Sequence, residues 1–567
     1  MSTLPPALRD AALRWIADDV DAGDRAELQR VLVSAMVGDG AAADELTDRM
    51  AGPLRFGTAG LRGPLRSGPN GMNRAVVIRA TAGLAAWLHA QGRSGTVVVG
   101  RDARHRSEAF AADVAGVFAA AGFETVMLPG ALPTPVLAFA VRRLGAVAGV
   151  QVTASHNPPG DNGYKVYLDS GTQLVPPTDR AIETAIAAAP AAVSVPTAPG
   201  WTRAGPALVD AYTERVAALA RGNARELRVA VTPLHGVGGA VLLEALRRAG
   251  FNDVHLVASQ SEPDPDFPTV GFPNPEEPGA ADALLALASE ANADLAVALD
   301  PDADRCALGV PDAGRWRMLR GDETGVLLGE HVLAGLDREA NPDPLVATSI
   351  VSSTLLRSVA AAHGARHDET RTGFKWLVRA GDGAGTGLVY AYEEALGYCV
   401  DPDVVRDKDG ISAAVLACDL AATARSAGRR VTDLLDDLAR AHGVYLTDSV
   451  GVWMDDHDAV ATAMARLRGR LPTELAGVPV TAEDLVHHPD QPDDTIALRG
   501  DGFRVMVRPS GTEPKLKAYL EVVEPLQDGH LDAARQLAVQ RRGRLRDAIE
   551  ALLRSPFCRT SSVPSAV

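Results

Sequence analysis

A chain of 567 residues, 46% hydrophobic and 23% charged, has the composition of a folded soluble protein and is long enough for about three to five domains. The formal net charge of −16 argues against a general nucleic-acid surface, but leaves room for a local basic pocket that binds an anion. The four cysteines form no CxxC pair, which argues against a disulfide framework and a thiolate zinc site.

The N-terminal region is predicted to be helical. Its first residues, MSTLPPALRDAALRW, lack the basic and then apolar pattern of a signal peptide. No apolar run in the chain approaches the roughly 20 residues of a membrane span, so we expect a cytoplasmic protein without a membrane partner. Leu13, Ile16 and Val20 recur at helical spacing in a segment rich in Ala, Leu, Arg and Glu, which predicts a helical extension over residues 1–50.

Three cycles of alternating strand-like and helical runs follow, and this alternation is typical of α/β architecture. They predict α/β domains over 51–205, 206–322 and 323–445, with the proline-rich SVPTAPGW (194–201) as the first connector. The strand-like runs are TVVVG (96–100), TVMLPG (125–130), AVAGVQVTAS (146–155), LRVAVTP (227–233), DVHLVAS (253–259), LAVALDPDADR (295–305), LVATSIVSS (345–353) and GLVYAYEEA (387–395).

The tail has a different pattern. TIALRGDGFRVMVRPSG and KLKAYLEVVE read as antiparallel strands around a short turn, and residues 530–553 read as a closing helix. We therefore expect a fourth, α+β domain over 446–567.

The stretch DPDADR carries three carboxylates directly after the apolar run LAVAL. Asp300, Asp302 and Asp304 alternate, and alternate side chains of an extended chain point the same way. Three carboxylates forced together repel one another unless a cation neutralises them, and an all-oxygen ligand set favours Mg²⁺. The alternative is a solvated acidic turn, whereas an EF-hand is excluded because Arg305 and Pro311 stand where it needs Gly and Glu.

The stretch VTASHNPPGDNGYK could hold a reactive serine in a stiff loop. Ser155 and His156 are adjacent, and adjacent side chains on an extended chain diverge, so we expect no triad; no GxSxG elbow is present either. A serine that attacks phosphorus needs cationic help, which an ion at the aspartates would supply, and Lys165 could transfer a proton. A plain hydrogen-bonded turn is the alternative.

Several other stretches are typical of anion or sugar binding. In RPSGTEPK, Arg508 can bind a phosphate, and Ser510, Gly511 and Thr512 can form a nest for an anion, although taken alone the stretch favours a strand-connecting turn. Glu393 in YEEALGY could accept hydrogen bonds from hydroxyl groups. Further candidates with ordinary surface or turn alternatives are Thr58 and Arg62 in FGTAGLRG, Lys375 in TGFKW and Lys408 in RDKDG.

In this order, TASHNPPGDNGYK, DPDADR, EEALGY with DKDG, and RPSGTEPK resemble the α-D-phosphohexomutase superfamily. The flanking FGTAGLRG, LHGVGG and TGFKW resemble its phosphoglucomutase and phosphopentomutase branch, which carries a helical N-terminal extension. The resemblance covers roughly residues 10–525. It implies a heart-shaped, four-domain fold with three mixed-sheet α/β domains and a smaller α+β domain.

The resemblance also implies an activity and roles for individual residues. The chain would interconvert sugar 1-phosphates and 6-phosphates through a phosphoserine and a bisphosphate, with Mg²⁺ and a sugar bisphosphate such as glucose 1,6-bisphosphate as cofactors. Ser155 would be the phosphoryl donor and Arg305 would lie beside it, with Lys165 and His156 at the positions for proton transfer and support. The implied metal ligands are Ser155, Asp300, Asp302 and Asp304, and the implied substrate-binding residues are Thr58, Arg62, Lys375, Glu393, Lys408, Arg508, Ser510, Gly511 and Thr512.

One departure leaves the sugar open. Many members have Ser two residues after the first sugar-reading Glu, where this chain has Ala395. We expect glucose phosphate first, mannose phosphate second and pentose phosphate third as substrate. The rivals outside the family are a haloacid-dehalogenase-type phosphatase with Asp300 as nucleophile, a dinucleotide enzyme that uses LHGVGG, and a catalytically silent sugar-phosphate sensor.

Overall fold

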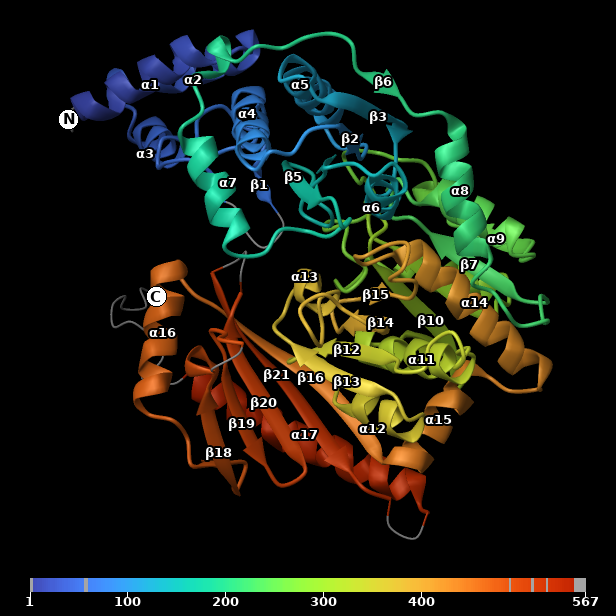
Figure 1. The fold of residues 1–567 in the computed structure, drawn as a ribbon. Coiled ribbons are helices and arrows are strands. Elements are labelled where there is room, and N and C mark those ends of the chain that lie inside the picture. Colours follow the sequence, from blue (N-terminus) through green and yellow to red (C-terminus); the bar gives the residue numbers. More distant parts are fainter. Residues whose placement is uncertain (1–3, 56–59, 489–490, 511–513, 527–528, 555–567) are drawn as a thin grey trace. The chain divides into compact units, whose positions relative to one another are not determined.

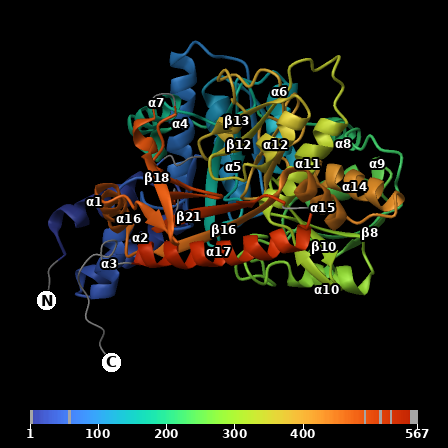
Figure 2. The same cartoon turned by 90° about the horizontal axis from the view of Figure 1, so that it is seen from below.

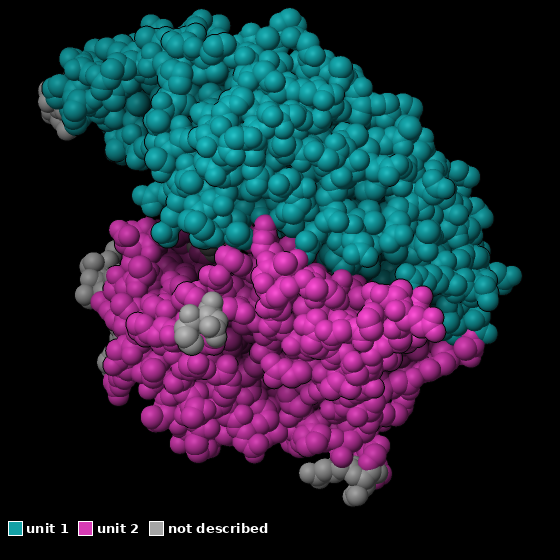
Figure 3. All heavy atoms as spheres, in the orientation of Figure 1, with its two compact units in different colours: residues 1–319, 396–426 teal, residues 320–395, 427–567 magenta. Residues whose placement is uncertain are grey.

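The structure is a computed structural model that describes residues 4–55, 60–488, 491–510, 514–526 and 529–554 (Figure 1). The chain forms two compact units (Figure 3). Unit 1 comprises residues 1–319 and 396–426, and unit 2 comprises residues 320–395 and 427–567. Among the described residues, no helix has both the length and the apolar character that crossing a membrane would need.

The predicted N-terminal helices are confirmed. They are α1 (Pro6–Asp18), α2 (Ala22–Met36) and α3 (Gly40–Arg49). Asp21 caps α2 by accepting hydrogen bonds from the backbone N–H groups of Gly23 and Asp24, which explains why the helix begins there. The three helices enclose a small core of their own around Leu28, Leu32 and Leu46.

The first α/β region of unit 1 is a mixed sheet in the order β1-β5-β4-β2-β3-β6. Its central pairs are parallel, whereas β5 runs antiparallel to both β4 and β1. Its elements are β1 (Leu61–Pro64), α4 (Arg74–Ala90), β2 (Thr96–Arg101), α5 (Ser107–Ala120), β3 (Glu124–Ala131), α6 (Thr134–Arg143), β4 (Ala148–Val152), β5 (Asp161–Leu168), α7 (Thr178–Ala187) and β6 (Thr202–Arg203).

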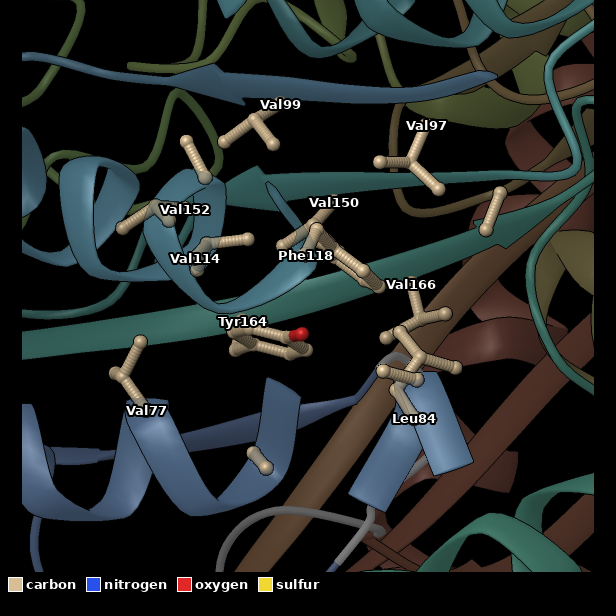
Figure 4. Close-up of a cluster of buried hydrophobic side chains, with 14 of the residues drawn as sticks. Val77, Leu84, Val97, Val99, Val114, Phe118, Val150, Val152, Tyr164 and Val166 are labelled. Carbon is tan, nitrogen blue, oxygen red and sulfur yellow. The ribbon is translucent and has the colours of Figure 1, made fainter. Parts of the chain in front are cut away.

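The core of this region explains the sequence pattern of its strands. β4 is buried along its whole length, as expected for a strand that is covered on both faces. Figure 4 shows Val150 and Val166 from neighbouring strands packed with Phe118 of α5, and the ring of Tyr164 facing Val77 of α4. This core fixes β4 and β5, and the loop between them carries Ser155.

The second region of unit 1 is a mixed sheet in the order β11-β10-β9-β7-β8. The late segment 396–426 belongs to the same unit, and its helix α14 packs against α8 and α9. The elements are α8 (Pro206–Ala217), β7 (Arg228–Thr232), α9 (Gly239–Arg248), β8 (Asp253–Leu256), α10 (Asp282–Glu290), β9 (Leu295–Leu299), β10 (Cys306–Asp312), β11 (Arg315–Met318), β15 (Gly397–Cys399) and α14 (Gly410–Ser426).

Unit 2 begins with an α/β region in which β12 pairs in parallel with β13 and with β14. This region contains α11 (Gly321–Ala334), β12 (Leu345–Ser349), α12 (Leu355–Ala362), β13 (Arg366–Thr370), α13 (Phe374–Leu377) and β14 (Leu388–Glu393). The predicted strands at 345–353 and 387–395 are thus confirmed, with shorter bounds.

The tail of unit 2 is an antiparallel sheet in the order β16-β21-β20-β19-β18-β17, with α17 packed along β16 and β21 (Figure 2). The two predicted strand segments and the closing helix are confirmed, and the structure adds β16, β17, β18 and α16. The elements are α15 (Val431–His442), β16 (Val444–Trp453), α16 (His457–Gly469), β17 (Glu474–Leu475), β18 (Val478–Asp484), β19 (Ile496–Gly500), β20 (Phe503–Pro509), β21 (Lys515–Glu524) and α17 (Leu531–Arg554).

Candidate active site

Ser155 lies in the loop that follows the buried strand β4, and its side chain points at an aspartate from the second sheet. Its hydroxyl donates a hydrogen bond to Asp300 Oδ2 over 2.8 Å, and it lies 3.2 Å from His156 Nδ1. The expectation that the side chains of Ser155 and His156 diverge is therefore wrong. Ser155 has a φ of 52°, so the backbone here is left-handed rather than extended, and the two neighbours turn toward each other.

The three aspartates converge as predicted, but a tight turn brings them together rather than an extended chain. Directly after β9, Ala303 has a φ of 55° and its N–H donates to the carbonyl of Asp300 over 2.9 Å. One carboxylate oxygen from each of Asp300, Asp302 and Asp304 lies within 4.8 Å of the others, and all three residues are buried. The solvated acidic turn is thereby excluded.

Two lysines partly neutralise this acidic cluster. The ammonium of Lys165, on β5, lies 2.6 Å from Asp302 Oδ2 and 2.9 Å from Asp304 Oδ2, and it is 1% exposed. Lys408 lies 3.4 Å from Asp304 Oδ2. The sequence did not identify Thr134, at the start of α6, whose hydroxyl donates to Asp302 Oδ2 over 2.5 Å.

Burial and neighbouring charges set the ionisation of the cluster. Burial, together with the charges of Asp302 and Asp304, raises the pKa of Asp300 well above its usual range. Burial also acts to raise the pKa of Asp302 and Asp304, but neighbouring cations and hydrogen bonds, with Lys165 the largest contributor, hold both pKa values below their usual range. Two ionised carboxylates thus stand beside a third whose negative charge is disfavoured.

The donor set fits a hard divalent cation. Oδ1 of Asp302 and Oδ1 of Asp304 are buried and have no hydrogen-bond partner among the described residues. Buried carboxylate oxygens without a partner are costly, and a cation at this point would satisfy both. Carboxylate oxygens are the ligands that Mg²⁺ and Ca²⁺ take in proteins, so the triad can hold such an ion.

Arginine side chains add positive charge around Ser155. The backbone N–H of Arg305 donates to Asp300 Oδ1 over 3.0 Å, and its guanidinium lies 3.9 Å from Asp304 Oδ1. Nε of Arg62, on β1, is buried and has no hydrogen-bond partner in the part of the chain that the structure describes, and burial lowers the pKa of its guanidinium. Burial, aided by Arg305 and Arg62, holds the pKa of His156 well below its usual value, so its imidazole is neutral.

The loop PLHGVGG after β7 supports the aspartate turn. A Cβ on Gly236 would lie 2.4 Å from Pro301 Cα, and a Cβ on Gly238 would lie 2.7 Å from the Cβ of Ala303. The N–H of Val237 donates to the carbonyl of Pro301 over 2.8 Å. These glycines let the backbone approach the aspartate turn, which accounts for LHGVGG without a dinucleotide.

The remaining candidates lie in unit 2 or outside the described residues. Glu393 ends β14 and Lys375 lies in α13, and both are buried. Nε of Arg508, on β20, is buried and has no hydrogen-bond partner within the described ranges. The N–H of Ser510 donates to the carbonyl of Lys515 over 2.8 Å. Thr58, Gly511 and Thr512 lie outside the described residues.

Four domains of one family match the chain. They are described as phosphoglucomutase/phosphomannomutase α/β/α domain I (residues 53–192), domain II (209–314), domain III (320–442) and the C-terminal domain (465–534). Together they leave only short stretches of residues 53–534 unmatched.

Named relatives and a solved structure agree with this match. A probable phosphomannomutase of Haemophilus influenzae is 42% identical over 80% of this chain and 93% of its own. A probable phosphoribomutase of Schizosaccharomyces pombe is 32% identical over 91% of this chain and 94% of its own. The crystal structure of a putative phosphomannomutase from Thermus thermophilus superposes with a TM-score of 0.67 at 24% identity, over 86% of this chain and 99% of that one, which supports the fold.

Proposed function

Because the chain belongs to the phosphoglucomutase/phosphomannomutase family of the α-D-phosphohexomutase superfamily and is an intramolecular phosphotransferase, we propose that it interconverts hexose 1-phosphate and hexose 6-phosphate. The reaction runs through a phosphoserine at residue 155 and a sugar bisphosphate. Glucose phosphate is the first candidate substrate, and mannose and pentose phosphates are the alternatives, since the relatives' names include a phosphomannomutase and a phosphoribomutase.

One contact carries this proposal. The Ser155 hydroxyl donates to Asp300 Oδ2 over 2.8 Å, at the rim of a buried carboxylate triad that is suited to a cation. A nucleophile that exchanges phosphoryl groups needs cationic charge on the transferring group, and the triad would supply it through Mg²⁺. A catalytically silent sensor would not need both a serine nucleophile and a cation-binding triad beside it.

The chain's own residues divide the work of the transfer. As the bond between Ser155 Oγ and phosphorus breaks, a bond forms between phosphorus and a sugar hydroxyl oxygen. The Lys165 ammonium is the candidate that donates a proton to the leaving Ser155 Oγ, and the resulting amine takes up the proton of the sugar hydroxyl. Arg305 and Arg62 stabilise the charge on the phosphoryl oxygens. His156 is neutral, so its Nδ1 can accept a hydrogen bond from the Ser155 hydroxyl after the transfer.

Asp300, Asp302, Asp304 and Ser155 would hold the magnesium ion. When bound, the ion spreads charge away from the transferring phosphoryl group. The return step repeats the same chemistry: the bisphosphate turns over, and its other phosphate is transferred to Ser155 Oγ, which releases the isomeric monophosphate.

The family resemblance supports roles for residues of other loops. Glu393 would accept hydrogen bonds from sugar hydroxyls, and Arg508, Ser510, Gly511 and Thr512 would bind the phosphate that does not react. Thr58, Lys375 and Lys408 would complete the substrate contacts. Nε of Arg508 is buried and has no partner among the residues that the structure describes, which is consistent with an anion ligand.

The test compares the rates of the wild type on glucose 1-phosphate, mannose 1-phosphate and ribose 1-phosphate, with Mg²⁺ and glucose 1,6-bisphosphate present. We expect Ser155→Ala to lose nearly all turnover, while Ser170→Ala, which removes a hydroxyl bonded to Thr172, keeps it. Intact-mass and peptide mass spectrometry should find phosphate on Ser155. Full mutase activity of Ser155→Ala would refute the phosphoserine at residue 155, and phosphate on Asp300 instead would favour the phosphatase.

A further inference from the structure

A single buried arginine holds the backbone of the Ser155 loop. The guanidinium of Arg104, in the loop after β2, donates to the carbonyl of Ser155 over 2.7 Å and to the carbonyl of Pro158 over 2.7 Å. It also donates to the carbonyls of Asn157 and Asp161. Arg104 is only 4% exposed, so these hydrogen bonds are shielded from water. Four carbonyls of one loop thus depend on one side chain.

The Ser155 loop needs such a support because its backbone is strained. The left-handed conformation of a serine costs free energy and persists only where the surroundings determine it. The N–H of Ser155 donates to Thr153 Oγ1 over 2.9 Å, and the carbonyl of the same residue is held by Arg104. Arg104 therefore fixes the direction in which the Ser155 hydroxyl points.

The turn that carries Arg104 is itself rigid. Asp102 Oδ1 accepts hydrogen bonds from the backbone N–H of Arg104 over 2.9 Å and from the Ser107 hydroxyl over 2.6 Å. Asn162 on β5 donates to the carbonyl of His105 over 2.9 Å. The turn 102–107 is thus bonded at both ends.

The N-terminal extension is tied to this same turn. Arg106 has a φ of 65°, and its guanidinium forms a two-pronged ion pair with Asp24 of α2, with both N–H···O distances 2.8 Å. Asp24 is 4% exposed, and Asp21 adds a carboxylate 3.6 Å from Arg106. A paired, shielded fork of this kind fixes geometry as well as adding energy. Only His105 separates the two arginines along the chain.

We propose that the N-terminal extension braces the nucleophile loop, through the path from Asp24 to Arg106 to Arg104 and on to the carbonyls around Ser155. Arg104 and Arg106 are positioning residues: they act through Ser155 and not on the substrate. The brace rests on the proposed role of Ser155 for its effect on catalysis, but its geometry stands without that role.

Loosening the brace affects the transfer step and leaves substrate binding unchanged. A displacement of a reacting atom by about 1 Å can cost about 10²-fold in rate, because the reacting groups must stay aligned. The residues proposed to grip the sugar and its second phosphate lie elsewhere in the chain. We therefore expect kcat to fall and KM to stay constant.

The first experiment compares Asp24→Asn with Glu27→Gln in the full-length protein. Glu27 lies on the same helix and pairs with Arg49 over 2.7 Å, but Arg49 does not belong to the turn 102–107. We expect Asp24→Asn to lower kcat by about 3- to 10-fold at constant KM, and to speed amide hydrogen exchange in residues 102–107 and 153–161. Glu27→Gln should leave kcat, KM and exchange in both segments at wild-type values.

The second experiment removes the central guanidinium. Arg104→Gly should lower kcat by about 10²-fold or more, and added methylguanidine should restore part of it, because the free guanidinium can occupy the vacated space. Arg106→Lys, which keeps the charge but loses the two-pronged pair, should reproduce the effect of Asp24→Asn. It serves as the second probe of the extension if Asp24→Asn folds poorly.

The possible outcomes distinguish failure of the proposed brace from failure of the proposed mutase function. If the wild type shows no mutase activity, the proposed function fails, and hydrogen exchange still decides the brace. If the wild type is active but Asp24→Asn and Arg106→Lys keep kcat within twofold, with unchanged exchange in 153–161, the brace is refuted. A rise in KM at constant kcat would also refute it, because it would place these residues in substrate binding.

Discussion

At the scale of single residues, Lys165 compensates the negative charge that the buried aspartate cluster brings into the folded chain. Its ammonium is buried between Asp302 and Asp304, and Asp304 has a second cation, Lys408, at 3.4 Å. Buried ion pairs add little over an apolar replacement of the whole group, but removal of one partner leaves an uncompensated charge. Lys165 is therefore a structural counter-ion in addition to its proposed role in proton transfer.

Lys165→Met should be strongly destabilised in EDTA and partly rescued by Mg²⁺. We expect a loss of about 3–5 kcal/mol in the free energy of unfolding without the ion, because the carboxylates lose their counter-charge. A bound divalent ion compensates the same carboxylates, so the loss should shrink when Mg²⁺ is present. Urea unfolding of both proteins in EDTA and in Mg²⁺ measures this.

The matched control for Lys165→Met is Arg228→Met, which breaks an exposed pair with Asp253 at 2.9 Å. This change should cost no more than about 1 kcal/mol in either buffer. If Mg²⁺ does not reduce the difference in the free energy of unfolding between Lys165→Met and the wild type, the triad does not bind the ion at this point.

The sequence identified the residues of this cluster that stand next to strand ends. The sequence shows that each of them comes shortly after an apolar run that predicts a strand: Ser155, Asp300, Asp302 and Asp304. Thr134 was missed because its bond to Asp302 spans 168 positions along the chain, and an isolated Thr before a helix carries no signal for it. Arg104 stands in GRDARHRS, a stretch rich in Gly and Arg, but its four carbonyl partners appear only once the loops are folded together.

At the scale of elements, the aspartate turn is shaped by the loop beneath it. In that loop Leu234 and His235 have φ values of 46° and 57°, and Gly236 brings the backbone against Pro301. Consecutive left-handed residues other than glycine are rare and costly, so their presence next to the aspartates indicates a loop built for close approach.

Gly236→Ala should displace the aspartate turn. The new Cβ would lie 2.4 Å from Pro301 Cα and 2.5 Å from its carbonyl oxygen, and both are backbone atoms that cannot rotate away. We expect weaker Mg²⁺ activation and a kcat reduced by about 10-fold or more, because the carboxylates move relative to Ser155. A titration of activity against Mg²⁺ concentration measures both effects.

Gly271→Ala is the matched control for Gly236→Ala, since a Cβ there has no atom within 4 Å. It should behave as the wild type in the same titration. An unchanged Mg²⁺ dependence of Gly236→Ala would mean that the turn tolerates a shift and that the loop only fills space.

β16 was not predicted from the sequence, because its pairing with a neighbouring strand stabilises it rather than an alternating pattern of its own. β16 includes a polar stretch around Asp448 and a glycine at 451, which interrupt any simple alternation. Its pairing with β21 over ten residues stabilises it nevertheless. A Cβ at Gly451 would lie 2.3 Å from Cε of Lys515 on that partner strand, but this flexible side chain can move aside, so the pairing with β21 defines the strand rather than packing at the glycine.

At the scale of the whole molecule, the chain builds its units from separate segments. The third cycle of the sequence spans residues of both units, since residues 396–426 group with unit 1. The sequence pattern places residues 396–426 in the third α/β domain, but it does not reveal that α14 packs on α8 and α9. Such grouping depends on contacts between distant segments, which local patterns do not encode.

Unit 2 holds its α/β part and its antiparallel sheet together through Arg504. Its guanidinium lies 2.9 Å from Glu521 Oε2 and 3.2 Å from Glu369 Oε1, and it bonds the carbonyl of Ser352. Glu521, on β21, also accepts a hydrogen bond of 2.6 Å from the Ser353 hydroxyl. This network joins β20 and β21 of the sheet to β13 and the loop after β12.

Arg504→Met should therefore unfold unit 2 early while leaving unit 1 intact. Loss of the guanidinium leaves the buried Glu521 carboxylate without its cationic partner, which costs about 3–5 kcal/mol for a buried pair, whereas Glu369 keeps Arg357 at 2.5 Å. Because a chain of several domains need not unfold in one step, calorimetry should show a transition at lower temperature. Hydrogen exchange should assign that transition to residues 320–395 and 427–554.

The matched control for Arg504→Met is Arg499→Met, which breaks an exposed pair with Glu483 on the same sheet and should leave the transition temperatures unchanged. A single transition lowered for both units alike would show that they unfold as one body, and the assignment of Arg504 to unit 2 alone would fall.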